Sequence, residues 1–253
     1  VQLKTKSKMF CRCDNRDDQL PNTAICPICL AHPGTLPVPN RQAVEWAIQA
    51  AQALGCRVSE VSKFDRKNYF YPDLPKGYQI SQYDQPIGSD GLLEYDDDAG
   101  VRRRVGIRRI HLEEDAAKNL HSIDGQHTLV DFNRAGVPLM ELVTEPHVFG
   151  SAGEAAKAAS GFAKELQFVL WYLGASEANM EKGEMRVEAN VSVSKSATRG
   201  TKVEVKNINS FRATERAIEY EIARQSGALE RGEKIVQETR GWDEVKGETF
   251  SQR

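Results

Sequence analysis

The sequence predicts an α+β protein, because helical and strand patterns of apolar residues occur in separate stretches of the chain. The spacing of amphipathic helices occurs three times, at 41–54, 151–173 and 211–226. Valine or alanine alternates with polar residues at 186–193 and 202–207, and the loop between them contains Gly200, which predicts an antiparallel hairpin. Another alternating stretch, 108–114, predicts a strand with charged side chains.

The predicted helices have recognisable boundaries. Gly55 should end the first, Ser151 and Glu154 form a capping box that begins the second, and Ser210 caps the third, which should end at Gly227. The apolar stripe of the first helix is Val44, Ile48, Ala51 and Leu54, and that of the second is Ala155, Ala158, Phe162, Leu166, Val169 and Leu173. We expect these two helices to be scaffold.

Composition describes an ordinary globular protein with room for one large domain or two small ones in 253 residues. The formal charge of −2 is not that of a nucleic-acid polycation, so any contact with nucleic acid would be local. No apolar run approaches the ~18 residues of a membrane span and no signal peptide is visible, so we expect a cytoplasmic protein. Val1 begins inside an alternating pattern and the last residues are polar, which suggests a piece of a longer chain.

Four of the five cysteines form two close pairs, Cys11-x-Cys13 and Cys26-x-x-Cys29, separated by twelve residues. Four thiolates at this spacing can surround one tetrahedral ion, which predicts a structural Zn²⁺ site at about 11–29, with paired redox thiols or four unrelated cysteines as the alternatives. The ion would stabilise a loop that is too polar to fold by itself. Cys56 lies outside this spacing and should be a small buried side chain.

Alternation within 108–114 places Arg109, His111 and Glu113 on one face of a strand, with Ile110 and Leu112 on the other. A carboxylate, an imidazole and a guanidinium would then lie together. Solvated outer faces of two edge strands, in 108–114 and 128–146, are the plainer interpretation.

Two loops are expected to precede this strand. The stretch 63–87 is rich in proline and aromatic residues and should be neither helix nor ordinary strand, either a functional loop or a surface Ω-loop, with Lys67 and Lys76 as its notable cations. An acidic connector should follow at 84–100. Five arginines then occur within eight residues and predict either a solvated basic face or phosphate contacts: Arg102, Arg103, Arg104, Arg108 and Arg109.

In the predicted hairpin, keeping the valines on one face places Glu188 and Asn190 beside Glu204 and Lys206. Carboxylates on adjacent strands repel one another unless a cation lies between them. Lys206 and Arg186 could neutralise them, or a divalent ion could do so. Mg²⁺ suits such oxygen ligands, and an exposed charged hairpin is the alternative.

Several long motifs resemble the family of B subunits of the aspartyl/glutamyl-tRNA amidotransferases, in that family's order along the chain. They are Y-F-Y-P-D-L-P-K-G-Y-Q-I-S-Q (69–82), L-V-D-F-N-R-A-G-V-P-L-M-E-L (129–142), R-V-E-A-N-V-S-V (186–193) and V-E-V-K-N-I-N-S (203–210). The cysteine motif followed by H-P-G-T-L-P-V-P-N is similar to the zinc-bearing members. The resemblance covers the whole chain and about the first half of a family member.

The resemblance implies a cradle-shaped α+β domain with antiparallel strands and flanking helices across 1–253, without the family's C-terminal helical tRNA-binding domains. It also implies the reaction: ATP and Mg²⁺ phosphorylate the side-chain carboxylate of Glu-tRNA(Gln) or Asp-tRNA(Asn), and ammonia released from glutamine then displaces the phosphate. The implied partners are the amidase of the complex (its A subunit), its small C subunit and the mischarged tRNA. No P-loop motif is present, so nucleotide binding would be of another kind.

Site residues carried over by resemblance are as follows. Glu113, Glu204 and Glu188 are expected as catalytic Mg²⁺ ligands; Lys206, Asn190, Asn207 and Arg109 would contact nucleotide phosphates or the aminoacyl end; Lys76 would line the ammonia path or the interface with the amidase. The family's Glu-x-His pair would precede Val1. Two alternatives stay open, a zinc-stabilised RNA-binding or assembly module without catalysis and the archaeal relative that serves tRNA(Gln) alone.

Overall fold

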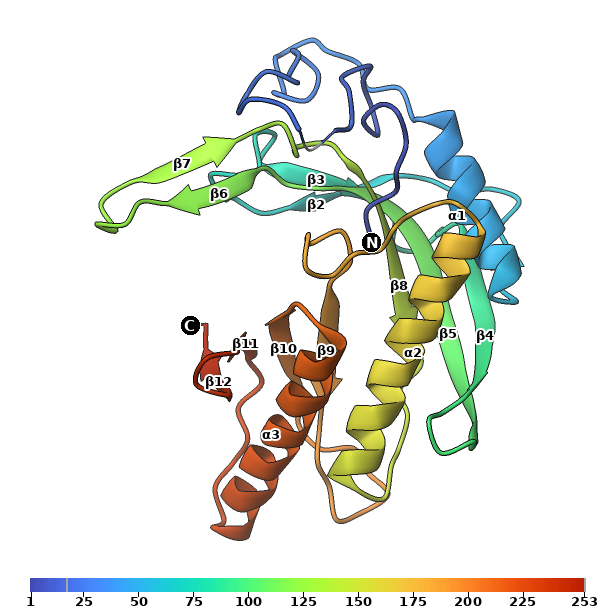
Figure 1. The fold of residues 1–253 in the computed structure, drawn as a ribbon, viewed down its shortest axis with the longest axis vertical. Coiled ribbons are helices and arrows are strands. Elements are labelled where there is room, and N and C mark those ends of the chain that lie inside the picture. The colour runs from blue at the N-terminus through green and yellow to red at the C-terminus, as the bar shows by residue number, and fades with distance from the viewer. Residues whose placement is uncertain (17, 253) are drawn as a thin grey trace. The chain divides into compact units, whose positions relative to one another are not determined.

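A computed structural model describes residues 1–16 and 18–252 of the protein, and it confirms the α+β class (Figure 1). The helices are α1 (Arg41–Ala53), α2 (Ala152–Tyr172) and α3 (Phe211–Glu230). The strands are β1 (Arg57–Val58), β2 (Asp65–Asn68), β3 (Tyr78–Ser81), β4 (Gly88–Asp96), β5 (Arg102–Glu114), β6 (Lys118–His121), β7 (Thr128–Asp131), β8 (Pro138–Thr144), β9 (Val187–Val191), β10 (Val203–Ile208), β11 (Thr239–Asp243) and β12 (Glu248–Ser251).

The fold divides into two compact units. The first comprises Val1–Leu93, Gly106–Glu145 and Val169–Glu177, and the second comprises Glu94–Val105, Pro146–Phe168 and Ala178–Arg253. The long elements β4, β5 and α2 contribute residues to both units.

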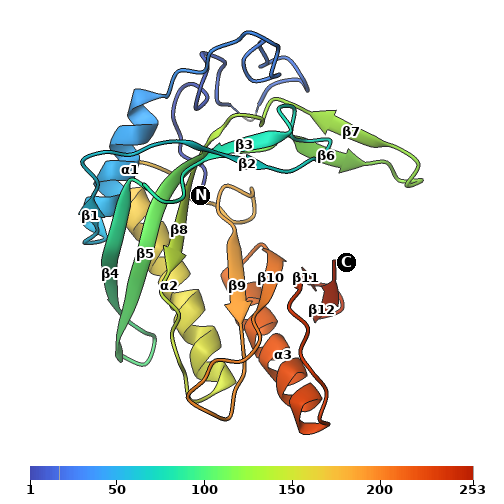
Figure 2. The same cartoon turned by 180° about the vertical axis from the view of Figure 1, so that it is seen from behind.

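A four-stranded sheet in the order β1-β4-β5-β8 contains the longest strand, β5, as an inner strand; β4, β5 and β8 run side by side in both views (Figure 2). The predicted alternation in this strand is present, but both faces are covered. Ile110 and Leu112 are fully buried on one face, and His111 and Glu113 are almost fully buried on the other. A plain pair of edge strands with solvated faces is therefore wrong for β5.

The expectation that 63–87 contains no ordinary strand is wrong. β2 and β3 pair as an antiparallel ladder in the register Lys67↔Gln79 and Asp65↔Ser81. Most of the aromatic and proline residues lie in the connection between these strands, so they obscured a short two-stranded ladder in which β3 buries Ile80 and Ser81.

The acidic connector expected at 84–100 is also largely a strand, β4. Its alternation is clear in the burial, since Leu93 and Tyr95 are buried whereas their neighbours are exposed. Gly91 is required here, because a Cβ at this position would lie 2.4 Å from the sulfur of Cys56. Cys56, which follows α1, is only partly buried and not fully buried as predicted.

The helix boundaries were predicted better than their buried faces. Asn40 caps α1 through its side chain, Gly55 follows it at φ +63°, and the Glu154 N–H donates to the Ser151 hydroxyl at the start of α2. The residues that α1 buries are Ala43, Ala47, Ala50, Ala51 and Leu54; those of α2 are Ala156, Ala158, Ser160, Ala163, Leu166 and Leu170. Alanines bring the helices close to their neighbours, so each buried face is centred on small residues. Of the larger predicted side chains, Leu54 and Leu166 are buried, and the others are only partly buried: Val44, Ile48, Phe162, Val169 and Leu173.

In the second unit, the predicted β9–β10 hairpin is confirmed, with Glu204 opposite Asn190 and Val205 opposite Ala189. The sheet continues in the order β12-β11-β10-β9, with β11 parallel to β10, so two strands that the sequence did not predict lie in the polar C-terminal stretch. Helix α3 packs against this sheet around a shared apolar cluster: Ala156, Ala189, Val191, Val205, Ile208, Ala213, Ala217, Ile218 and Trp242.

Helix α3 begins after Ser210 as predicted, but it continues through Gly227 and ends only before Gly232, whose φ is +77°. A glycine inside a helix weakens it by about 1 kcal/mol without ending it. In the part of the chain that the structure describes, no helix combines the length and apolar character needed to cross a bilayer.

Candidate functional site

Three side chains from two paired strands of the first unit converge on one point. His111 and Glu113 lie on the same face of β5, and Glu141 of β8 lies directly opposite His111 in the antiparallel register. The His111 Nε2 lies 3.3 Å from Oε1 of Glu113 and 3.6 Å from Oε2 of Glu141. One ligand atom from each residue lies within 4.8 Å of the other two, so the three could hold a metal ion.

Neutral donors hold the Glu113 carboxylate in place. Ser81 Oγ donates to Oε1 at 2.5 Å, and Gln79 Nε2 donates to Oε2 at 3.2 Å and to the Glu114 carbonyl at 2.7 Å. Burial would raise the pKa of Glu113, but hydrogen bonding with His111 and Ser81 and the positive charge of Lys67 keep it below its ordinary value. The carboxylate is therefore ionised, as a metal ligand must be.

The donor set fits a divalent cation. Two carboxylates with one imidazole suit ions that accept oxygen and nitrogen ligands, and the buried Nδ1 of His111 has no hydrogen-bond partner among the described residues. Glu141 has a side chain that is 47% exposed, so the cluster opens to solvent on that side and leaves coordination positions for water or a substrate.

Sequence reasoning found part of this cluster. It placed His111 beside Glu113 but named only Glu113 as a ligand, and it missed Glu141. The strand alternation carried the signal for His111. Glu141 could be found only from the register between β5 and β8, which alternation within one strand does not give.

Beside Glu113, the adjacent Glu114 pairs with Lys76. Lys76 Nζ lies 2.7 Å from Oε2 of Glu114, and the Ile80 N–H donates to Oε1 at 3.1 Å. Burial raises the pKa of Glu114, and the charge of Lys76 offsets only part of that effect. This pair lines a cavity of about 230 Å³ that also contacts Lys8, Cys29 and Tyr78.

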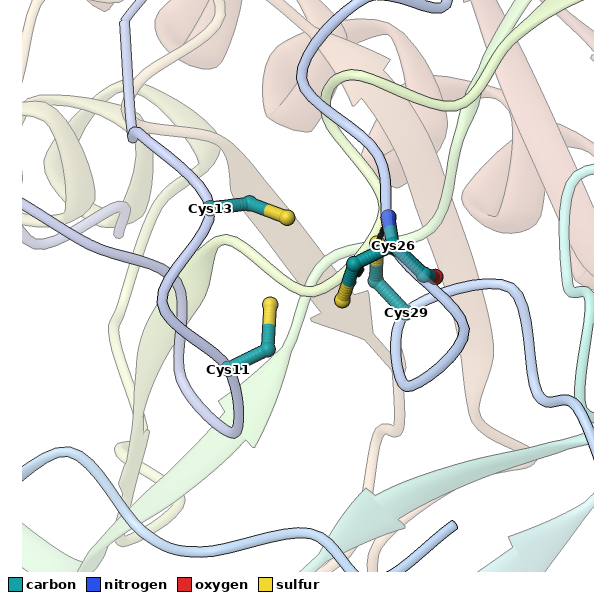
Figure 3. Close-up of side chains that lie close together, drawn as sticks. All are labelled: Cys11, Cys13, Cys26 and Cys29. Atoms are coloured by element: carbon teal, nitrogen blue, oxygen red, sulfur yellow. Dashed lines mark hydrogen bonds between the residues drawn. The ribbon is translucent and has the colours of Figure 1, made fainter.

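The four predicted cysteines gather as the spacing indicates. The four sulfur atoms lie within 4.8 Å of one another, and none of them forms a disulfide bond (Figure 3). A hydrogen bond from the Cys11 thiol lowers the pKa of Cys29 to about 4, with help from the charge of Lys8. The fully buried Lys8 donates to the Cys29 sulfur at 3.7 Å and to the Phe132 carbonyl at 3.2 Å.

Lys206 bridges the carboxylates of the hairpin in the second unit. Its Nζ lies 3.4 Å from Glu188 and 3.7 Å from Glu204, and Thr239 also donates to Glu204 at 2.9 Å. Burial would lower the pKa of Lys206, but the two carboxylates raise it above its ordinary value. The sequence left open whether basic side chains or a divalent ion balance the two carboxylates. In the structure, Lys206 lies close enough to neutralise both. Asn190 faces Glu204 across the ladder, and Asn207 has φ +64° at an irregularity in β10.

The arginine-rich stretch is largely paired with carboxylates. Arg102 and Arg104 contact Glu94, Arg103 contacts Asp97 and Glu154, and Arg108 forms a bidentate pair with Glu145. Arg109 differs, because its guanidinium lies 5.2 Å from the centre of the Tyr83 ring and its buried Nε has no partner within the described chain. Arg109 is thus the member of the stretch best placed to meet a ligand.

Comparisons with known proteins show the family of the chain. A family described as the GatB/GatE catalytic domain matches residues 1–253. The chain is 52% identical to the B subunit of the aspartyl/glutamyl-tRNA(Asn/Gln) amidotransferase from Thermodesulfovibrio yellowstonii, with all of the chain and 52% of that protein covered. It is 52% identical to the protein of the same name from Thermotoga maritima (53% covered) and 51% identical to that from Gloeobacter violaceus (46% covered), again over the whole chain. The chain therefore spans about half the length of the curated relatives it matches.

Proposed function

Because the chain belongs to the GatB/GatE catalytic domain family, we propose that it carries the ATP-dependent step of an aminoacyl-tRNA amidotransferase, a glutamine-dependent carbon–nitrogen ligase. The observation that carries this proposal is the convergence of His111, Glu113 and Glu141 on one point, together with the relatives named as amidotransferase subunits. The substrates would be Glu-tRNA(Gln), Asp-tRNA(Asn) or both. The products would be Gln-tRNA(Gln) and Asn-tRNA(Asn).

The reaction has two steps. An oxygen of the substrate's side-chain carboxylate attacks the γ-phosphorus of ATP, ADP leaves, and an acyl phosphate forms. The nitrogen of ammonia then attacks the acyl carbon, inorganic phosphate leaves, and a proton is lost to give the amide. Phosphoryl transfer of this kind depends mainly on positioning and on neutralising the phosphate charge.

His111, Glu113 and Glu141 would hold Mg²⁺. When bound, this ion would neutralise phosphate oxygens and orient them for transfer. Ser81 and Gln79 fix the orientation of Glu113 and, with His111 and Lys67, keep it ionised. Glu188 and Glu204 stay predicted as further Mg²⁺ ligands; Lys206 now lies between them, so a cation bound there would have to displace its ammonium group.

The remaining site residues keep their predicted roles as part of this proposal. Lys206, Asn190, Asn207 and Arg109 would contact nucleotide phosphates or the aminoacyl end of tRNA. Lys76 would belong to the ammonia path; its pairing with Glu114 beside a cavity supports a polar route rather than a packed core. The partners would be the amidase (the A subunit of the complex), the small C subunit and the mischarged tRNA, in the cytoplasm.

Cys11, Cys13, Cys26 and Cys29 would hold a structural Zn²⁺. Four thiolates around a divalent ion carry a net charge of −2, and the buried Lys8 beside Cys29 is placed to offset part of it. All four ligand positions would be filled by sulfur, so this ion would stabilise residues 11–29 and take no part in the reaction.

The test is amide formation on Glu-tRNA(Gln) and Asp-tRNA(Asn) by the full-length protein with its amidase partner. We expect product to depend on ATP and to be lost in Glu113→Ala, which should also weaken the binding of Mg²⁺·ATP in isothermal titration. Glu94→Gln is the matched control, because this glutamate is paired with surface arginines. Equal activity and nucleotide binding in Glu113→Ala and wild type would refute the proposal.

The cysteine cluster favours a second candidate, a zinc-stabilised RNA-binding or assembly module in which the carboxylates are incidental. It predicts tRNA binding that is lost with the zinc and is indifferent to ATP. The archaeal relative that serves tRNA(Gln) alone is distinguished by the substrate: only Glu-tRNA(Gln) would be amidated.

A further inference from the structure

The β2–β3 hairpin brings a second strand to the face that carries Glu113. Gln79 and Ser81 of β3 both donate to the Glu113 carboxylate, so their side chains point toward it. Lys67 of β2 is directly opposite Gln79 in the antiparallel register, and Asp65 is opposite Ser81. Directly opposite residues project from the same face of a ladder, with their Cβ atoms about 5 Å apart. Lys67 therefore projects from the face that contacts Glu113.

Among the cations of this hairpin, Lys67 is the one without a partner in residues 1–16 and 18–252. Its neighbour Arg66, on the opposite face, lies 5.0 Å from the centre of the Tyr78 ring. Nearby Lys63 pairs with Asp65 and Asp84, and Lys76 pairs with Glu114. Lys67 is exposed, and its ammonium forms no ion pair or hydrogen bond with the residues that the structure describes, although its charge acts on Glu113.

Glu113 does not need Lys67 as a direct partner. Its two oxygens already accept hydrogen bonds from Ser81 and Gln79 and lie beside His111. With a divalent cation bound, the charges of Glu113 and Glu141 would be cancelled, and Lys67 would leave the cluster with an excess positive charge. Such an excess suits a polyanion, and a lysine on a flexible stem commonly contacts phosphate as a point charge.

We propose that Lys67 binds a non-bridging phosphate oxygen of a metal-bound polyphosphate held at the His111–Glu113–Glu141 cluster. The inference rests on the proposed function for the identity of that ligand as ATP. The proposal rests on three observations: the ammonium of Lys67 has no partner among the described residues, Lys67 lies opposite Gln79, and the cluster is open to solvent at Glu141. The role is that of a substrate contact, separate from holding the metal.

The experiment compares Lys67→Met with the matched control Arg66→Met, which removes a cation from the adjacent position on the opposite face. In the full-length protein, Mn²⁺ binding is measured by electron paramagnetic resonance, and binding of Mg²⁺·ATP and of Mg²⁺·pyrophosphate by isothermal titration. We expect Lys67→Met to keep its Mn²⁺ affinity within about twofold while its affinity for both phosphate ligands falls about 10- to 100-fold, the loss of one charge-assisted hydrogen bond. Arg66→Met should match wild type, and Lys67→Arg should recover part of the affinity.

The outcomes separate this inference from the proposed function. Unchanged phosphate binding in Lys67→Met, or an equal loss of Mn²⁺ and phosphate binding, overturns the role of Lys67. Lysine-dependent binding of pyrophosphate without any binding of ATP keeps that role and refutes the ATP-dependent function. A wild type that binds neither ligand refutes both. Lys67→Gln replaces Lys67→Met if the latter does not fold, and the same criteria apply.

Discussion

The two units hold carboxylates in different ways. In the first unit, Glu113 has a side chain that is 7% exposed and is held by the neutral donors Ser81 and Gln79. In the second, Glu188 and Glu204 are 50% and 29% exposed and share the ammonium of Lys206. Neutral donors orient a carboxylate without cancelling its charge, whereas a lysine cancels it. The Glu113 cluster is therefore the one that still attracts a cation.

The sharpest test of this difference is the loss of divalent-ion affinity. Glu113→Gln should lower Mn²⁺ affinity more than about 100-fold, because removing a direct ligand costs more than the 10- to 100-fold typical of an outer partner. Isothermal titration of Mn²⁺ into the full-length protein measures it. The matched Glu188→Gln and Glu204→Gln variants should lose less than about tenfold each, since Lys206 already neutralises these carboxylates. A larger loss in either of them would reverse the comparison.

The four cysteines of residues 11–29 should bind their metal ion independently of both acidic clusters. Cys26→Ser should abolish bound zinc, measured by elemental analysis, and increase amide exchange within 11–29, because the polar loop then loses the ion that stabilises it. The change in Mg²⁺·ATP affinity should be less than about threefold. Cys56→Ser is the control and should retain zinc. An intact protein that contains no zinc would show that the cluster has another role.

Removing one neutral donor should have an intermediate effect. Ser81→Ala deletes the hydroxyl that donates to Glu113 Oε1, and we expect Mn²⁺ affinity to fall about tenfold because the carboxylate loses a fixed orientation. Ser89→Ala, on β4, provides a control outside the cluster. The same affinity in both variants would mean that Gln79 and His111 suffice to position Glu113.

The smallest effect should come from the lysine of the second unit. Lys206→Met should lower the free energy of unfolding by less than about 1 kcal/mol, since its ion pairs are partly exposed to solvent. Urea denaturation measures the change, with the exposed Lys202→Met as control. A loss of several kcal/mol in the free energy of unfolding would show that these ion pairs stabilise the fold as strongly as buried pairs do.

Several parts of the molecule could be predicted from local sequence. The helix starts at Ser151 and Ser210 follow from capping chemistry, and the pairing of β9 with β10 follows from alternating valines. The strand β2 could not be found in this way, because its four residues are polar and its partner β3 follows a turn rich in proline and aromatic residues. Its existence depends on the ladder it forms with β3.

The sequence by itself determined the α+β class, the cysteine cluster and the face that joins His111 to Glu113, because periodicity and spacing are local properties. Tertiary structure alone decided that Glu141 completes the cluster, that Lys206 lies between Glu188 and Glu204, and that Lys67 projects from the face that contacts Glu113. Each of these depends on which residues face one another across paired strands. A shift of one residue in register would move the same side chains to the opposite face.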